Sequence, residues 1–127
     1  MNHNLVLGNF WRSWLGEGRR QRAVQLAINC YKFTRLFPQS ELYGLTTQIR
    51  RSSVSVASNI AEGYGRRSKP EYIQFLHIAL GSLRELDTQL IIAKVVDLAD
   101  KNLFTPLLNE VEEMQSILVA SLNKLKA

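Results

Sequence analysis

Glycine and proline are too rare and too unevenly placed in this chain for a protein built from many short strands. Seven of its 127 residues are Gly and three are Pro, and residues 19–37, 45–62 and 82–105 contain neither. Sandwiches and barrels need frequent turn residues between their strands. The pattern therefore favours long helices in one domain, for which a 46% hydrophobic content supplies an ordinary core.

Two helices are predicted in the first half of the chain. The first spans residues 19–36 and ends before Pro38, because the residue that precedes a proline is pushed out of the helical region. The second spans residues 41–63. A cap at Ser40 is predicted to start it, and the glycines of Gly63-Tyr64-Gly65 are predicted to stop it.

The third helix has the clearest start signal. Ser68 is followed by Pro70 and Glu71, which is the form of a capping box, and the helix is predicted over residues 69–98. The fourth is predicted to begin within residues 100–106 and to end near residues 124–126. Because the loops are short, successive helices are antiparallel neighbours. The predicted fold is an all-α, antiparallel up-down four-helix bundle over residues 19–127.

Residues 1–18 are predicted to form an N-terminal arm outside the bundle. Their apolar residues include Phe10, Trp11, Trp14 and Leu15. Such a segment packs on its own bundle or on a neighbouring chain, or it touches a membrane as an amphipathic piece. It lacks the continuous apolar core of a signal peptide.

A cytoplasmic location is expected from cysteine usage and hydropathy. Cys30 is the only cysteine, so no disulfide can form within the chain, and its apolar neighbours predict that it is buried. No run of apolar residues is long enough to span a membrane. We therefore expect a protein without a membrane partner.

Charge is divided unequally along the chain. Residues 1–69 carry 11 of the 16 Lys and Arg but 3 of the 11 Asp and Glu, a formal charge of +8, whereas residues 70–127 carry 5 and 8, a formal charge of −3. A basic half can follow a polyanion such as RNA. Equally, two oppositely charged halves of a bundle can attract each other.

Two helix faces carry residues that a single bundle does not need. On the second helix, small polar residues recur at steps of three and four: Ser52, Ser55, Asn59 and Glu62. This stripe is a recognition surface or a serine-rich solvent face. On the third helix, Ile78, Ile92 and Val96 lie almost opposite the apolar seam. We expect another copy of the chain to cover them, in a homo-oligomer to which Ser55, Asn59 and Glu62 also contribute.

Basic residues gather beside an aromatic after the second helix. Arg66, Arg67 and Lys69 follow Tyr64, and such a cluster can bind phosphates while the ring stacks on a base. Arg50 and Arg51 are predicted to extend this RNA-binding patch. The alternative is an ordinary solvated loop.

No catalytic residue is predicted, and no cofactor, metal or small-molecule substrate is expected. His3 and His77 have no Cys or carboxylate partner at a metal-binding spacing. The glycines near Tyr64 follow a helix rather than a strand and lack the lysine of a phosphate loop.

Several runs in the second and third helices resemble a known family. They are Glu41-Leu42-Tyr43-Gly44-Leu45, Gln48-Ile49-Arg50-Arg51-Ser52-Ser53, Asn59-Ile60-Ala61-Glu62-Gly63 and Gly81-Ser82-Leu83-Arg84-Glu85-Leu86. In these runs the chain resembles bacterial four-helix-bundle proteins encoded in intervening sequences of 23S rRNA genes. The resemblance covers residues 24–98, about 60% of the chain, and the fourth helix in pattern only. Where the family has a tryptophan at the start of its first helix, this chain has Arg19-Arg20.

The resemblance implies a ring-like homo-oligomer, a homopentamer, that associates with large-subunit ribosomal RNA. It also extends to accessory bundle proteins of retroelements that pair with a reverse transcriptase. The expected function is thus non-enzymatic binding of ribosomal RNA or another nucleic acid. The alternative is a protein-interaction scaffold or an accessory subunit of a nucleic-acid enzyme.

Overall fold

The structure is a computed structural model that describes residues 18–127. In that part of the chain it is all-helical, with four long helices and no strand, as predicted. The long helices are α2 (Arg19–Thr34), α3 (Thr47–Tyr64), α4 (Lys69–Val95) and α5 (Lys101–Lys126). The predicted N-terminal arm lies outside the described residues except for Gly18.

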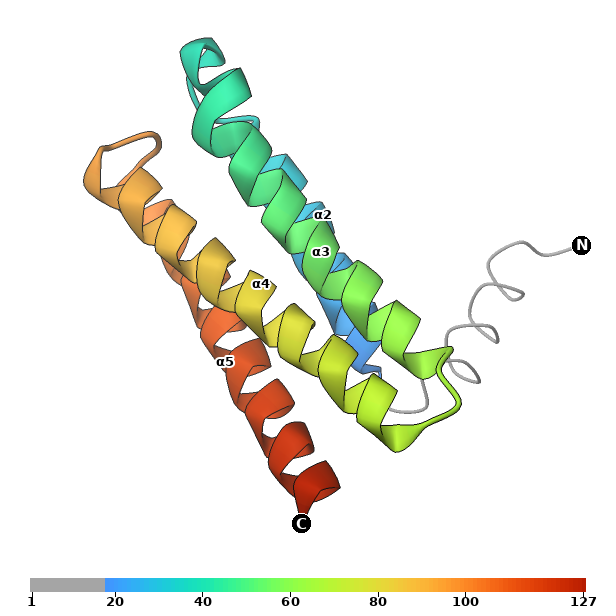
Figure 1. The fold of residues 1–127 in the computed structure, drawn as a ribbon. Coiled ribbons are helices and arrows are strands. Elements are labelled where there is room, and N and C mark those ends of the chain that lie inside the picture. The colour runs from blue at the N-terminus through green and yellow to red at the C-terminus, as the bar shows by residue number, and fades with distance from the viewer. Residues whose placement is uncertain (1–17) are drawn as a thin grey trace, which may run out of the picture.

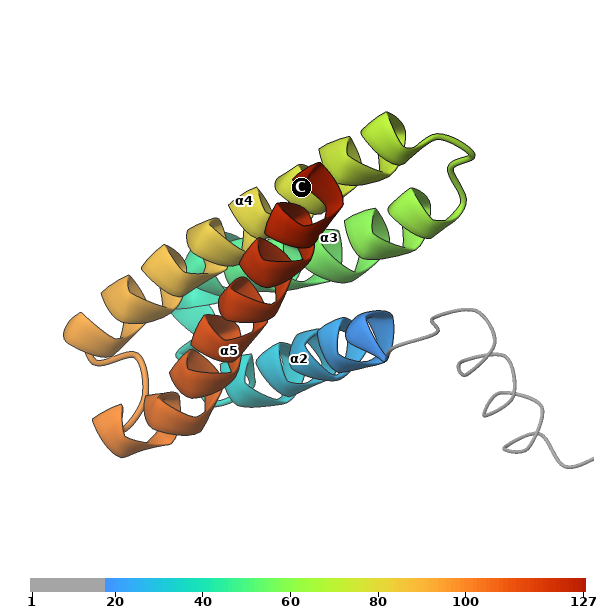
Figure 2. The same ribbon diagram turned by 90° about the horizontal axis from the view of Figure 1, so that it is seen from below.

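The four helices pack around one core, with short turns at alternate ends of the molecule (Figure 1). The most extensive contact joins α3 to α4. The contacts of α5 with α4 and of α2 with α3 are smaller, and the contact of α2 with α5 is the smallest among neighbouring long helices. Seen from below, α5 crosses away from α2 toward its C-terminus (Figure 2).

Apolar side chains from all four helices fill the core. Fully buried examples are Leu26, Ile60, Leu83 and Leu118, one from each helix. Cys30 is buried as predicted, and that burial raises the pKa of its thiol to about 12. Within residues 18–127, no helix combines the length and the hydropathy needed to cross a membrane.

The start of α4 confirms the capping-box prediction. Ser68 is the N-cap, and its Oγ accepts a hydrogen bond from the Glu71 amide at 3.3 Å. The same hydroxyl donates to Glu71 Oε1 at 3.1 Å. The helix ends at Val95, three residues earlier than predicted, because Asp97 adopts a left-handed φ of 61°. Asp100 then caps α5, within the predicted range.

The predicted start of the second helix at Ser40 is wrong. Ser40 lies inside a short 3-10 helix (Gln39–Glu41) that a π-helical turn (Leu42–Thr46) follows. The Glu41 side chain caps this turn by accepting from the Leu45 amide. The backbone of Gly44 is non-helical, which interrupts the path, so the regular helix α3 begins only at Thr47.

The predicted helix stop at Gly63-Tyr64-Gly65 is confirmed, because α3 ends at Tyr64 with Gly65 as its C-cap. Gly63 also serves close helix packing. It lies buried within α3, which continues to Tyr64. A Cβ at this position would lie 2.9 Å from Cδ1 of Tyr72 and 3.2 Å from Cβ of Phe75. The absence of a side chain therefore lets α3 and α4 approach each other where the turn joins them.

Replacing Gly63 by Ala is expected to lower the free energy of unfolding by about 1–3 kcal/mol, because the added methyl displaces α4. Gly81→Ala is the matched control. A Cβ at Gly81 meets no atom within 4 Å, so this change should stabilise the protein by about 0.5–1 kcal/mol through helix propensity alone. Urea unfolding followed by circular dichroism measures both. Equal effects of the two variants would contradict the packing role of Gly63.

Candidate nucleic-acid interface and contact surface

The turn between α3 and α4 brings together four of the six predicted RNA-binding residues: Tyr64, Arg66, Arg67 and Lys69. Arg66 is already engaged by the protein. Its Nη2 lies 3.0 Å from Oε2 of Glu62, and its guanidinium lies 4.7 Å from the ring centroid of Phe75. Arg67 and Lys69 are exposed. Glu62 therefore has a partner within its own chain, whereas we expected it to contribute to contacts between chains.

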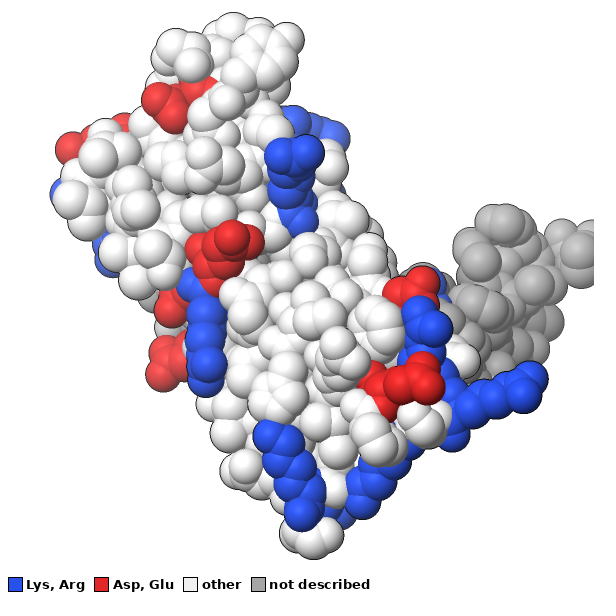
Figure 3. Space-filling view, viewed as in Figure 1, with Lys and Arg blue, Asp and Glu red and all other residues white. Residues whose placement is uncertain are grey.

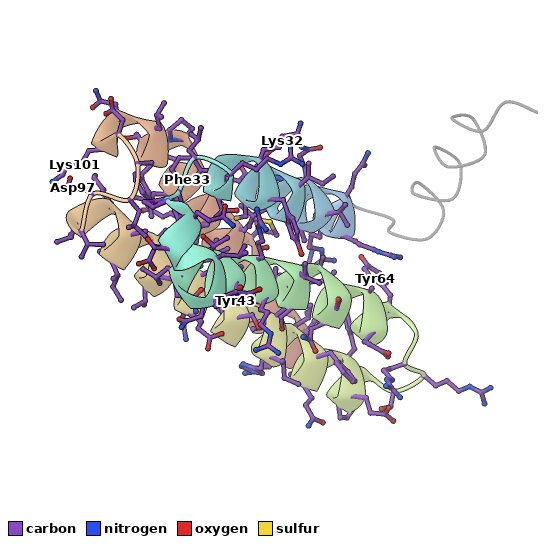
Figure 4. All side chains as sticks on the ribbon, turned by 90° about the horizontal axis from the view of Figure 1, so that it is seen from above. Lys32, Phe33, Tyr43, Tyr64, Asp97 and Lys101 are labelled. Carbon is purple, nitrogen blue, oxygen red and sulfur yellow. The ribbon has the colours of Figure 1, made fainter. Side chains whose placement is uncertain are left out.

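Tyr64 is not a flat exposed platform. It is half-buried at the end of α3, and its ring centroid lies 5.6 Å from that of Tyr72 on α4. Tyr64 thus packs on the bundle at one end of the molecule, whereas Asp97 and Lys101 lie at the other end (Figure 4).

Cations from two further elements lie at the same end as the turn, and sequence reasoning missed them. Arg19 and Lys124 line one cleft together with Tyr72, and Nζ of Lys126 lies 2.7 Å from Nε2 of His77. Lys and Arg side chains gather along this lower end in Figure 3. The signal was available in the expected topology, because an up-down bundle places its first residues and its last at the end that holds the second turn.

We call this region the basic end. It comprises the start of α2, the α3–α4 turn and the end of α5, and its cations are Arg19, Arg20, Arg66, Arg67, Lys69, Lys124 and Lys126. The acidic residues that share the end in the described chain are Glu62 and Glu71. The excess of positive charge suits a polyanion.

Arg50 and Arg51 do not extend this cluster. Thirteen residues of helix separate Arg51 from Tyr64, a rise of about 20 Å. Arg50 instead joins α3 to α2: its Nε donates to Oγ1 of the buried Thr34 at 2.9 Å, and its guanidinium lies 4.8 Å from the ring centroid of Tyr31. Arg51 beside it is exposed.

The small polar stripe of α3 makes contacts inside the chain. Ser52 is buried and donates to Oε1 of Glu85 at 3.1 Å, and the Ser55 and Ser82 hydroxyls lie 2.8 Å apart. Asn59 donates to the Ser55 carbonyl and hydroxyl. Ser52 and Ser55 therefore pack α3 against α4, while Ser55 and Asn59 are half-exposed and Glu62 is exposed.

The branched residues of α4 are exposed, as an uncovered contact surface requires. Ile78, Ile92 and Val96 expose 44%, 45% and 55% of their area. Ile78 lies one turn before Ser82, so the line adjoins the Ser55–Ser82 contact. The middle of this face carries a broad area without charge (Figure 3). We call it the α3–α4 face. Ile91 and Val95 are also exposed, on another side of α4.

In residues 18–127, no three His, Cys, Asp or Glu side chains are grouped as a metal ion requires. One group of ionic contacts ties α2 to α5. Nη2 of Arg22 on α2 lies 2.9 Å from Oε1 of Glu110 and 3.2 Å from Oε1 of Glu113 on α5. The two carboxylates of α5 thus balance the charge of Arg22.

Comparison with known proteins gives one family and one fold. The sequence model of a family described as the 23S rRNA-intervening sequence protein matches residues 19–120. The matched range is wider than residues 24–98, over which the sequence resembled this family, and it includes most of α5. A solved structure of a Bacteroides thetaiotaomicron protein with unknown function, from the S23 ribosomal protein family, is similar with a TM-score of 0.74. It shares 21% identity over 82% of this chain and 97% of that chain, which supports the fold alone. No curated protein sequence matches.

Neighbouring arginines of α3 should respond differently to the same change. Arg50→Gln is expected to lower the free energy of unfolding by about 1–2 kcal/mol, because it removes a charged hydrogen bond to buried Thr34 and the contact with Tyr31. Arg51→Gln should stay within about 0.5 kcal/mol of the parent, since Arg51 is exposed. Thermal or urea unfolding of both variants decides. Equal destabilisation by Arg50→Gln and Arg51→Gln would contradict the structural role of Arg50.

Proposed function

The chain belongs to the 23S rRNA-intervening sequence protein family, and from this premise we propose that it is a non-enzymatic, oligomeric protein of the cytoplasm that binds large-subunit ribosomal RNA. The observation that carries the proposal is the basic end. Arg67, Lys69 and Lys124 come from different elements of the fold and are exposed at one end. A surface of this kind binds phosphates with little regard to sequence.

We further propose that antiparallel up-down bundles assemble into a ring, a homopentamer, through the α3–α4 face. Exposed Ile78 and Ile92 supply apolar area, and the small side chains of Ser55 and Asn59 permit close approach. In such a ring the basic ends repeat around one axis. Several weak sites joined rigidly bind a long polyanion more tightly than one.

The second candidate function is a scaffold or an accessory subunit of a nucleic-acid enzyme such as a reverse transcriptase. The α3–α4 face favours it, because the broad area without charge in its middle also suits a protein partner. Capture of partners from the native cell, with and without nuclease, separates the two functions. A partner retained after nuclease treatment supports the scaffold.

Removal of three cations from the basic end should weaken RNA binding. The variant Arg67→Ala/Lys69→Ala/Lys124→Ala is expected to bind a 23S rRNA fragment at least about tenfold more weakly than the parent at low salt, because each residue neutralises a phosphate. The slope of log affinity against log salt should fall by about 2–3. Filter binding at rising salt measures both quantities.

The matched control is Lys32→Ala/Arg35→Ala/Lys101→Ala, which removes the same charge far from the basic end. It should change affinity by no more than about twofold, by a small long-range effect that salt screens. If both triple variants weaken binding equally, net charge rather than the basic end attracts the RNA. If the parent protein itself does not bind at low salt, the proposed function is wrong.

Charges on the α3–α4 face should reduce the size of the assembly. Ile78→Lys/Ile92→Lys is expected to give smaller particles by light scattering while circular dichroism stays helical, because a buried unpaired charge opposes association and the core seam is unchanged. Ile91→Lys/Val95→Lys is the control on another side of α4, where exposure is 47% and 66%. Equal masses for the parent and both variants would contradict assembly through this face.

A further inference from the structure

A cleft between α2 and α5 opens toward the basic end. The two helices meet where Phe33 packs on Phe104, with ring centroids 4.7 Å apart, and then separate toward the C-terminus of α5 (Figure 2). The open half forms a surface cleft of about 470 Å³. Its lining includes Arg19 and Arg22 from α2, Tyr72 from α4, and Ile117, Ser121 and Leu125 from α5.

The lining of the cleft includes a side chain from a third helix. Tyr72 belongs to α4, which has no substantial contact with α2, yet its side chain lines the cleft between α2 and α5. The volume lies within the range of about 300–1,000 Å³ that is typical of ligand clefts. An opening of this size accommodates large aromatic side chains.

Long arginine side chains, rather than apolar contacts, bridge α2 to α5 along this half. Arg22 reaches Glu110 and Glu113, and Nη1 of Arg19 donates to Oγ of Ser121 at 2.5 Å. Ile117 and Leu125 are half-buried in the same cleft. The cleft therefore offers apolar area with polar groups at its rim, which is the composition that suits an amphipathic aromatic such as tryptophan.

The chain itself delivers such side chains to the mouth of the cleft. Residues before Gly18 join α2 at Arg19, which lines the cleft, and residues 10–15 read Phe-Trp-Arg-Ser-Trp-Leu. We call residues 10–15 the aromatic segment. Trp14 lies four residues before Gly18, a maximum reach of about 14 Å. A tether this short gives a local concentration in the millimolar range, which a second copy of the chain does not match.

We propose that the aromatic segment of the same chain docks in the cleft between α2 and α5, with its tryptophans against Ile117 and Leu125. The match to the family begins at residue 19, so the aromatic segment lies outside the matched residues. Docking in the cleft places Arg12 of the same segment near the basic end.

Tryptophan fluorescence of the full chain tests this directly, because the two tryptophans of the protein, Trp11 and Trp14, both lie in the aromatic segment. The emission maximum should lie at shorter wavelength than in the urea-unfolded chain. Acrylamide should quench the emission less than it quenches N-acetyltryptophanamide. Leu125→Glu should shift the emission to longer wavelength and increase quenching, with the helical circular dichroism unchanged.

Ile28→Glu is the matched control, because Ile28 is 41% exposed in the separate groove between α2 and α3. It should leave the emission unchanged. If Leu125→Glu loses helicity, Ile117→Ser serves as the second cleft variant. Parent emission equal to that of the unfolded chain would overturn the proposal. So would a shift with Ile28→Glu alone, or a shift on dilution, which places the segment on a second copy.

Discussion

The close contact between α3 and α4 determines where the rest of the protein lies. At one end Gly63 leaves room for Tyr72 and Phe75, and near the middle the hydroxyls of Ser55 and Ser82 meet at 2.8 Å. Small side chains bring the two helix backbones together, so little freedom remains in the angle between them. The turn that joins them is consequently held against the bundle with its cations outward.

The positive potential of the basic end arises from side chains rather than from helix dipoles. Helices α2 and α4 begin at this end, whereas α3 and α5 finish there (Figure 1). Their positive amino ends and negative carboxyl ends are neighbours, so the partial charges largely compensate. Exposed cations such as Arg67 and Lys69 therefore supply the net field. If helix amino ends alone bound the anion, removal of these cations would not change its affinity.

The sequence predicted features that depend on residues close together in the chain, and it missed features that depend on packing between helices. The Ser68 cap depends on residues within one turn, and it was predicted correctly. The Ser40 cap failed because the backbone at Gly44 interrupts the helix after it. The helix stop at Gly63-Tyr64-Gly65 was predicted correctly, but the packing of Gly63 was missed because its neighbours Tyr72 and Phe75 belong to the next helix. The four helices and their core faces were predictable from periodicity, whereas the splay of α5 from α2 was not.

The candidate site shows the same division. Arg50 and Arg51 are equivalent in a basic pattern, yet 100° of helix rotation turns Arg50 toward Thr34 and leaves Arg51 in solvent. The sequence around Lys124 does not indicate a binding site. Lys124 lies at the basic end only because the topology places the end of α5 there. Pattern alone thus identifies candidate cations, and the fold sorts them into structural and accessible ones.

The basic end and the α3–α4 face depend on one another. A single basic end acts within a Debye length of about 8 Å at physiological salt, which is short beside an RNA helix. Binding that survives such screening needs several basic ends in fixed positions, and the α3–α4 face is where neighbouring copies are proposed to meet. The inner contact of α3 with α4 shapes that face, because Ser55 serves both sides of it. Loss of assembly should therefore weaken RNA binding with every cation in place, whereas loss of cations should leave the assembly intact.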